Sequence, residues 1–437
     1  MRIGVVSLGC AKNRVDTEEM LSLLTQEGYG LTEKPEEAEV LIINTCGFIT
    51  SAKEESIDAI FEMAQYKETG RCQALVVTGC LAQRYGEELM REIPQIDVLS
   101  GVDQYDTLAE AIDLALNKGQ RGQNTQRKQA FLHCGRVLTT PKYSAYVRIG
   151  EGCDNRCAYC AIPLIRGNHR SRPKEDILEE MARLASQGVK EHILIAQDTT
   201  RWGRDLQGES LKGLVEAAAA VPGVQWLRLL YCYPDETDKA LIDTMAAHDN
   251  VCRYLDLPLQ HAVPRILKSM NRRGDIGEIR ALLQYAREKG FALRTTFIVG
   301  FPGETEEEFE ALMDFVREVQ FDRMGAFTFS PEEDTAAALL PDQVPENIKK
   351  KRLQRLMALQ ADISLQRNQA RVGSVETVLV TGREGGLYTG RSAWEAPDAD
   401  GVIRFEAEPQ LKAGTFVQVR LTQAEPYDLK GVLEAQA

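Results

Sequence analysis

Six of the ten cysteines in this chain of 437 residues form two groups of three with very different spacing. The compact triad is Cys153, Cys157 and Cys160, and the dispersed triad is Cys10, Cys46 and Cys80. Each triad can supply three thiolates, the usual ligands of iron–sulfur clusters. A [4Fe-4S] cluster has four irons, so three protein ligands leave one iron open to a group that is not protein. Both triads are therefore candidates for iron centres that take part in chemistry.

The compact triad occupies one tight loop directly after a predicted strand at residues 145–149. Its spacing is suited to wrapping a single cuboidal cluster. Zinc is the main alternative, but zinc loops usually pair C-x2-C with a second ligand pair, and no such pair follows nearby. The other four cysteines, to which we assign no role, are Cys72, Cys134, Cys232 and Cys252.

The dispersed triad follows three predicted strands, at residues 3–7, 40–44 and 75–78. Its cysteines lie just beyond the carboxyl ends of these strands. In an open parallel sheet that edge is where ligands bind, so the three thiols can converge on one crevice. The alternative is that each is a small buried core residue, as free cysteines often are. Three cysteines in register argue against that alternative.

The segment Cys153-Asp-Asn-Arg-Cys157-Ala-Tyr159-Cys160 resembles the signature of radical S-adenosylmethionine (SAM) enzymes, in the first loop of a βα barrel. The resemblance implies that SAM binds the open iron and is cleaved to a 5′-deoxyadenosyl radical. An unactivated C–H bond has no acidic proton for a side-chain base, so its abstraction needs a radical carried by a cofactor. Tyr159 occupies the aromatic position that lies near the adenine in that superfamily.

Further contacts to SAM are predicted where loops follow barrel strands, at Gln197, Gln260, Gly300 and Glu304. A structural alternative exists for the last two, because glycine and proline are typical of any strand-to-helix turn. In the same loop, Thr305 with the glutamate three residues later reads as a helix capping box. The neighbouring His261 is interpreted as a structural residue.

The chain divides into three regions by its pattern. Residues 1–118 alternate strands with amphipathic stretches, which predicts an α/β domain with a parallel sheet, followed by a polar linker at 117–128. Six strand candidates within residues 139–370 predict a partial (βα)6 barrel. Its last helix starts with a charged run, Lys349 to Arg352, interpreted as a solvated face. Four strand candidates within 371–437 predict a small antiparallel β-barrel.

This layout resembles the methylthiotransferase family over the whole chain: a methylthiotransferase N-terminal domain, a radical SAM domain and a TRAM-like domain. The resemblance implies that the dispersed triad holds a second [4Fe-4S] cluster, whose open iron carries or delivers the sulfur to be inserted. One SAM molecule would supply the methyl group and another the radical. The enzyme would thus be a transferase that also needs an electron donor and a sulfur donor.

Methylthiotransferases modify either adenosine in tRNA or an aspartate of ribosomal protein S12, and this chain resembles the second branch. The resemblance lies in the segments Ser-Leu-Gly-Cys-Ala-Lys-Asn at 7–13, Asn-Thr-Cys-Gly-Phe-Ile at 44–49 and Ala-Lys-Glu-Glu-Ser at 52–56. The tRNA branch usually has Gln-Met-Asn after its first cysteine and Val-Arg after its second, and both are missing here. We therefore expect β-methylthiolation of S12, free or on the ribosome, with tRNA modification as the alternative.

The charge of the chain points the same way. The net charge is −13, which disfavours wide non-specific binding to nucleic acid. Residues 371–437 hold seven Lys and Arg against ten Asp and Glu, whereas a domain that grips tRNA should be basic. We expect no stable tRNA binding and suggest that Asp398 and Asp400 face a basic ribosomal protein. The alternative is that the acidic surface merely follows the overall composition.

The compartment follows from the first residues and the cysteines. No charged leader with a long apolar segment begins the sequence, and no stretch approaches 18 uncharged apolar residues, so we expect a cytoplasmic protein without membrane contact. Ten cysteines without a secretion signal suit a reducing compartment. A third class of function, a non-catalytic iron–sulfur electron carrier, would not cleave SAM.

Overall fold

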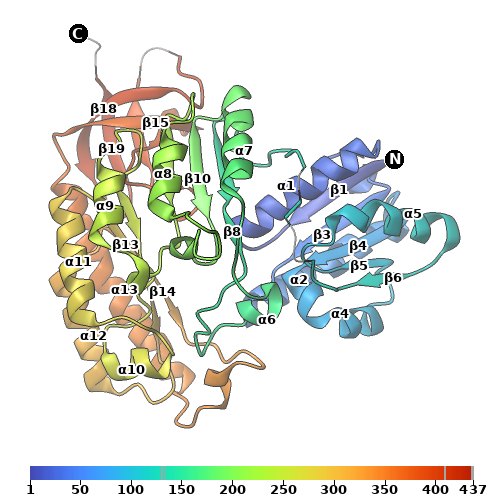
Figure 1. The fold of residues 1–437 in the computed structure, drawn as a ribbon, viewed down its shortest axis with the longest axis horizontal. Helices are drawn as coiled ribbons and strands as arrows, with labels where there is room; N and C mark the ends of the chain where they lie inside the picture. The colour runs from blue at the N-terminus through green and yellow to red at the C-terminus, as the bar shows by residue number, and fades with distance from the viewer. Residues whose placement is uncertain (129–130, 133, 408–409, 435–437) are drawn as a thin grey trace.

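The computed structural model describes residues 1–437 apart from 129–130, 133, 408–409 and 435–437. The chain forms an α/β region, a central open barrel and a small closed barrel, in that order from blue to red in Figure 1. Within the described residues, no helix is long and apolar enough to cross a membrane.

The N-terminal region is built on a six-stranded sheet with the order β2-β1-β3-β4-β5-β6 and parallel neighbours throughout. Its strands are β1 (Arg2–Ser7), β2 (Gly30–Leu31), β3 (Val40–Thr45), β4 (Ala74–Gly79), β5 (Val98–Ser100) and β6 (Gly122–Asn124). Its helices are α1 (Ala11–Gln26), η1 (Pro35–Glu37), α2 (Thr50–Ala64), α3 (Tyr66–Thr69), α4 (Cys80–Glu92), η2 (Tyr105–Thr107) and α5 (Leu108–Lys118). The predicted parallel α/β fold is confirmed. The predicted linker is wrong in part, because β6 lies inside it and extends the sheet.

The central barrel is open and consists of two parallel three-stranded sheets, β11-β10-β7 and β12-β13-β14. Its strands are β7 (Ser144–Arg148), β10 (Glu191–Ile195), β11 (Trp226–Leu229), β12 (Tyr254–Asp256), β13 (Ala292–Val299) and β14 (Arg323–Thr328). Two further short strands, β8 (Gly150–Glu151) and β9 (Arg170–Ser171), form a separate antiparallel pair. An isolated parallel bridge between Leu227 and Val251 joins the two sheets. The six predicted strands are confirmed.

Helices cover the outside of this barrel and bury their apolar faces against the strands. The covering helices are α7 (Lys174–Ser186), α8 (Leu211–Ala219), α9 (Lys239–Ala246), α11 (Ile276–Glu288), α12 (Glu306–Val319) and α13 (Glu346–Gln369). The loops carry α6 (Ile162–Arg166), η3 (Thr199–Arg201), η4 (Pro234–Glu236), α10 (Pro264–Ser269) and η5 (Ala336–Leu339). In α13 the solvated interpretation of the charged run is wrong for Lys349 and Arg352, each 5% exposed. Lys349 Nζ donates to Phe329 O at 2.8 Å, and Arg352 pairs with Glu304 at 2.7 Å.

The C-terminal region is a closed five-stranded barrel with the order β15-β16-β17-β19-β18. Its strands are β15 (Val375–Glu384), β16 (Leu387–Arg391), β17 (Ile403–Glu406), β18 (Phe416–Ala424) and β19 (Leu429–Leu433). The prediction missed β16, which forms a tight hairpin with β15. One strand pair also differs from the predicted antiparallel barrel. Strands β17 and β19 pair in parallel, whereas the other four pairs are antiparallel.

A loop of this small barrel, residues 392–401, enters the interior of the central barrel. Tyr254 Oη donates to Asp400 at 2.6 Å, and Arg294 lies 3.8 Å from the same carboxylate, whose side chain is 2% exposed. Asp400 therefore cannot face a ribosomal protein as we expected. Asp398 remains 59% exposed but contacts Tyr146 Oη at 2.9 Å.

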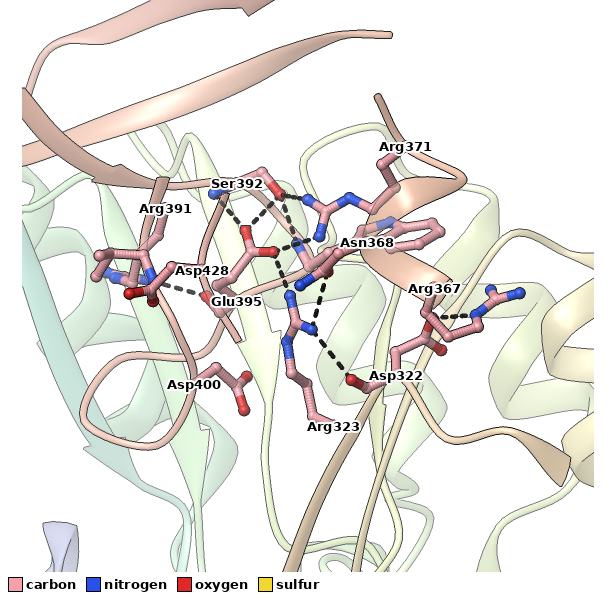
Figure 2. A network of polar contacts seen from close by, with 12 residues as sticks. Asp322, Arg323, Arg367, Asn368, Arg371, Arg391, Ser392, Glu395, Asp400 and Asp428 are labelled. Atoms are coloured by element: carbon pink, nitrogen blue, oxygen red, sulfur yellow. Dashed lines mark hydrogen bonds and ion pairs between the residues drawn. The ribbon is translucent and has the colours of Figure 1, made fainter. Parts of the chain in front are cut away.

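Buried ion pairs fix the small barrel to the central one. Figure 2 shows Glu395 between Arg323 and Arg371, with hydrogen bonds of 2.8 Å and 2.6 Å. A second pair group joins Glu191 of β10 to Arg391 of β16 at 2.6 Å and to Arg228 of β11 at 3.2 Å. Removing one partner of such a pair is strongly destabilising, because it leaves an uncompensated buried charge.

The ion pairs of Glu191 make the stability of the protein depend on pH. Burial alone would raise the pKa of Glu191, but Arg391 and Arg228 overcome it and lower the pKa to about 2. Stabilisation by this carboxylate is therefore complete above about pH 4.5 and is lost as pH falls from there through 2, a change of about 3 kcal/mol. Thermal unfolding of wild type and Glu191→Gln from pH 6 to pH 2 should show a difference in Tm between the two proteins that narrows below pH 4.5. A difference in Tm that stays constant over this pH range would contradict this expectation.

The N-terminal region is joined to the central barrel by a buried network of two arginines and four carboxylates. Arg148 of β7 pairs with Asp16, with Glu19 at 2.5 Å and with Glu151 at 3.0 Å. Arg166 of α6 pairs with Asp16 at 2.6 Å and with Glu151 at 3.0 Å. The fourth carboxylate is Asp103. Burial raises its pKa to about 6, and the charges of Arg148 and Arg166 act in the opposite direction. Helix α6 lies between the two regions in Figure 1, so the network spans their boundary.

Candidate metal centre

All six cysteines of the two triads line one cavity with a volume of about 620 Å³. The cavity lies between the carboxyl ends of the N-terminal strands and the mouth of the central barrel. The exposed rings of Phe48 and Phe327 also line it and give it an apolar rim. The sequence placed each triad at a ligand-binding edge, and the structure brings both edges to the same space.

The dispersed triad converges because each cysteine follows a strand of the same sheet. Gly9, which precedes Cys10, has a φ of +90°, and a Cβ there would lie 2.9 Å from Cys46 Cβ. Gly79, which precedes Cys80, has a φ of +95°, and a Cβ there would lie 2.5 Å from the Thr45 carbonyl oxygen. Both turns need glycine so that the loops can approach one another.

Asn13 connects all three loops of the dispersed triad. Its Nδ2 donates to the carbonyl oxygens of Leu8 at 3.0 Å and Thr45 at 2.9 Å, just ahead of Cys10 and Cys46. Its Oδ1 accepts from Arg166 Nη2 at 2.7 Å, and the Cys80 thiol lies 3.4 Å from the same oxygen. Arg166 Nη2 is also 3.5 Å from Cys80 Sγ. A residue of the barrel thus reaches a cysteine of the N-terminal region.

The compact triad is held by the loop that follows β8. Cys153 N donates to the carbonyl of Gly167 at 3.0 Å, and Cys160 N donates to the carbonyl of Cys157 at 3.0 Å. Arg272 Nη1 lies 3.8 Å from Cys157 Sγ, and Tyr233 Oη lies 3.7 Å from it. Each triad is therefore accompanied by one arginine, and charge-assisted donors of this kind favour thiolates.

Burial favours the protonated form of four of these thiols. It raises the pKa of Cys80 to about 12 and the pKa of Cys153 to about 11, and it also raises the pKa of Cys46 and Cys160. A metal centre would supply the charge needed to ionise them. Within the described chain, no three His, Cys, Asp or Glu side chains form a preassembled site for a single ion. Thiolates on one zinc lie about 4 Å apart, given Zn–S bonds of about 2.3 Å. Thiols that instead surround a cavity suit a bulky cluster.

Three of the predicted SAM contacts lie in this cavity: Tyr159, Gln197 and Gln260. Gln197 Nε2 donates to Glu151 Oε1 at 2.7 Å, whereas its Oε1 is buried without a hydrogen-bond partner among the described residues. Buried polar atoms are normally paired, so this oxygen indicates a missing ligand with a hydrogen-bond donor. An amino group, such as the one SAM carries, fits that need.

The other two predicted SAM contacts, Gly300 and Glu304, are not among the described residues that line the cavity. The Glu304 carboxylate accepts from Gly300 N at 2.9 Å and from Arg352 Nη1 at 2.7 Å. Thr305 and Glu308 form the predicted capping box at the start of α12. The structural alternative explains this loop without SAM.

His261 also has a structural environment. The ring is fully buried, its Nδ1 accepts from Val263 N at 3.1 Å, and its Nε2 lies 3.4 Å from Glu304. The structural interpretation of this histidine therefore agrees with its contacts.

Sequence reasoning missed the charged residues of the cavity. Lys12, Arg166 and Arg272 line it, and no Asp or Glu does so among the described residues. Lys12 and Asn13 lie two and three positions after Cys10, so their place at the start of α1 was a usable signal. Arg272 had no signal, because it is far from either triad in sequence. Cys232, to which we assigned no role, also lines the cavity.

Comparisons with known proteins agree with this division of the chain. Residues 2–101 match a family described as uncharacterized protein family UPF0004, residues 147–316 the radical SAM superfamily and residues 372–433 the TRAM domain. The chain is 51% identical to the ribosomal protein uS12 methylthiotransferase RimO of Desulforamulus reducens, over 99% of both proteins. It is 50% identical to the protein of the same name from Heliobacterium modesticaldum, over 99% of this chain and 95% of that one.

Among solved structures, the fold is similar to that of the radical S-adenosylmethionine methyltransferase TsrM from Kitasatospora setae, with cobalamin and a [4Fe-4S] cluster bound. The TM-score is 0.56 at 14% identity, covering 89% of this chain and 76% of that chain. At this identity the likeness concerns the fold alone.

Proposed function

Since the chain belongs to the family of ribosomal protein uS12 methylthiotransferases, we propose that it adds a methylthio group to the β-carbon of an aspartate of ribosomal protein S12 (uS12). The protein is a radical SAM enzyme and a transferase. It uses SAM and [4Fe-4S] clusters. When bound, these cofactors supply the carbon-centred radical, the sulfur and the methyl group.

We assign one cluster to each triad of cysteines. The compact cluster is held by Cys153, Cys157 and Cys160, and the dispersed cluster by Cys10, Cys46 and Cys80. The observation that carries this assignment is that all six thiols line one cavity without an acidic side chain among the described residues. Arg272 and Arg166 donate toward one cysteine of each triad and so offset the negative charge of the thiolates.

The SAM contacts proposed in the barrel are Tyr159, Gln197 and Gln260, which line the same cavity. Gln197 is oriented by Glu151, so its free Oε1 points to the ligand rather than to the protein. Gly300 and Glu304 act on this site only through the fold of their loop. Phe48 and Phe327 flank the entry and exclude water once a peptide covers them.

The proposed domains are residues 1–118, 139–370 and 371–437, with β6 added to the first sheet. Turnover also requires an electron donor and a sulfur donor. We expect no stable tRNA binding, on the support of the net charge of −13. Because the enzyme must meet its substrate where ribosomes are made and used, we propose the cytoplasm as its location.

Mass spectrometry tests the proposed reaction directly. After anaerobic reconstitution, the enzyme should hold about eight irons per chain, as two cubane clusters require. With SAM and a reductant, an S12 peptide that contains the target aspartate should gain CH2S, about 46 Da. The same mixture with tRNA should show no such gain. A gain on tRNA alone would overturn the choice of substrate, and the absence of SAM cleavage would favour an electron carrier.

A further inference from the structure

Lys12 differs from Arg166 and Arg272, the other cations of the cavity, because its side chain makes no hydrogen bond or ion pair among the described residues. It is the second residue of α1, two positions after Cys10, and it lines the cavity although the residue is only 8% exposed. In the described part of the chain, no carboxylate lies within ion-pair distance of its ammonium group. A buried ammonium is favourable only beside negative charge. The cluster proposed on Cys10 would supply part of this charge, and a ligand carboxylate would complete it.

The two neighbouring cations are already engaged. Arg166 pairs with Asp16 at 2.6 Å and with Glu151 at 3.0 Å. Arg272 donates to the carbonyl of Pro258 at 2.5 Å and stacks on the ring of Tyr233, 3.9 Å from its centroid. Lys12 is therefore the cation that remains for a ligand.

Tyr231 holds the Lys12 side chain in place. The ammonium nitrogen lies 3.3 Å from the centroid of the Tyr231 ring, which also lines the cavity. Tyr231 has a φ of +63°, a left-handed conformation that is strained for a bulky residue and is typical of functional sites. Its backbone is fixed by hydrogen bonds to Asp256 at 2.9 Å and Thr199 at 3.0 Å. A cation–π contact uses the face of the ring and leaves ammonium hydrogens for an oxygen acceptor.

We propose that Lys12 binds the side-chain carboxylate of the target aspartate and makes the enzyme select an acidic residue. This inference rests on the proposed function, because it takes S12 as the substrate. The position favours the substrate over SAM as the bound anion. Lys12 lies in the first turn of α1 beside Cys10, whereas the proposed SAM contacts belong to the barrel beside the compact triad.

The test is a double-mutant cycle on binding rather than on turnover. Affinity is measured by fluorescence anisotropy, with a labelled S12 peptide that contains the target aspartate and with its Asp→Asn form. Enzyme loaded with clusters and SAM is used without reductant, so no product forms. Lys12→Met should weaken binding of the Asp peptide by about 10- to 100-fold, as expected for a lost charge-assisted contact, and leave the Asn peptide within about 2-fold. Wild type should prefer Asp over Asn, and Lys12→Met should not.

Two further variants control for charge and folding. Lys12→Arg keeps the cation and should keep most of the preference for the Asp peptide. Arg14→Met removes a cation from the same helix that is not among the described residues of the cavity, and both peptides should bind it like wild type.

Three results would overturn the proposal. Equal weakening of both peptides by Lys12→Met would make the residue structural, and unchanged binding would remove it from the site. A loss of SAM affinity with intact peptide binding would reassign Lys12 to SAM. If wild type binds neither peptide and modifies none, the proposed function itself fails and the inference with it.

Discussion

Cys157→Ala abolishes both SAM cleavage and product, whereas Cys46→Ala still cleaves SAM but yields no methylthiolated peptide. The reason is that each substitution leaves one triad with two thiols, too few for a cluster that already lacks a fourth protein ligand. The two triads come from different regions of the chain, so the loss of one need not disturb the other. Cys157 lies in the barrel beside Arg272, and Cys46 follows β3.

The measurement separates the two activities in the same samples. 5′-Deoxyadenosine is quantified by chromatography and the peptide by mass spectrometry, and each variant should retain about four irons per chain. Cys72→Ala is the matched control, because that thiol is buried in the apolar core of the N-terminal region and is not among the described cavity residues. It should keep both activities. Equal loss of both activities in Cys46→Ala would contradict the division of work between the triads.

The convergence of the cysteines was predictable because its signals are local. Parallel strands end at one edge of a sheet, so cysteines that follow consecutive strands must meet there. The compact triad needs no fold at all, since its spacing alone places three thiols in one loop. The TRAM-like domain was predictable as a small β-barrel for a similar reason, although the register that pairs β17 with β19 in parallel is set by tertiary contacts.

The failures concern partners that are distant in sequence. For Glu304, the sequence did not show that Arg352 of α13 binds its carboxylate. Asp400 reads as part of an acidic surface, yet Tyr254 inside the barrel binds it. Arg352 itself reads as a solvated charge. These cases share one explanation. The sequence shows that a side chain is charged, but it does not show which residue neutralises the charge.

The residues of the cavity that sequence reasoning missed have the same origin. Lys12 and Arg166 become notable only when the N-terminal region and the barrel share one space. The pattern could indicate that Lys12 starts a helix after Cys10. It could not indicate that the ammonium group has no carboxylate partner among the described residues, because that depends on every neighbour at once.

Glu395→Ala should destabilise the protein by about 3–5 kcal/mol, the usual cost of breaking a buried ion pair by removing one partner. Burial alone would raise the pKa of Glu395, but Arg371 and Arg323 together hold it far below its ordinary value. Its second oxygen accepts from Ser392 N at 2.9 Å and Ser392 Oγ at 2.7 Å, as Figure 2 shows. The alanine variant would leave Arg323 buried without its carboxylate and Arg371 with Glu376 alone, and the loop that enters the barrel would lose one of its anchors.

Thermal and denaturant unfolding measure this loss, and limited proteolysis locates it. Arg371 begins the C-terminal region, so cleavage near residues 371–374 should release the small barrel sooner in Glu395→Ala than in wild type. Glu434→Ala is the matched control, because its pair with Arg420 joins side chains that are 33% and 46% exposed. Exposed pairs contribute about 0.2–1 kcal/mol, so that variant should unfold nearly like wild type. Similar losses in both variants would mean that the small barrel is held by its apolar contacts and not by the buried charges.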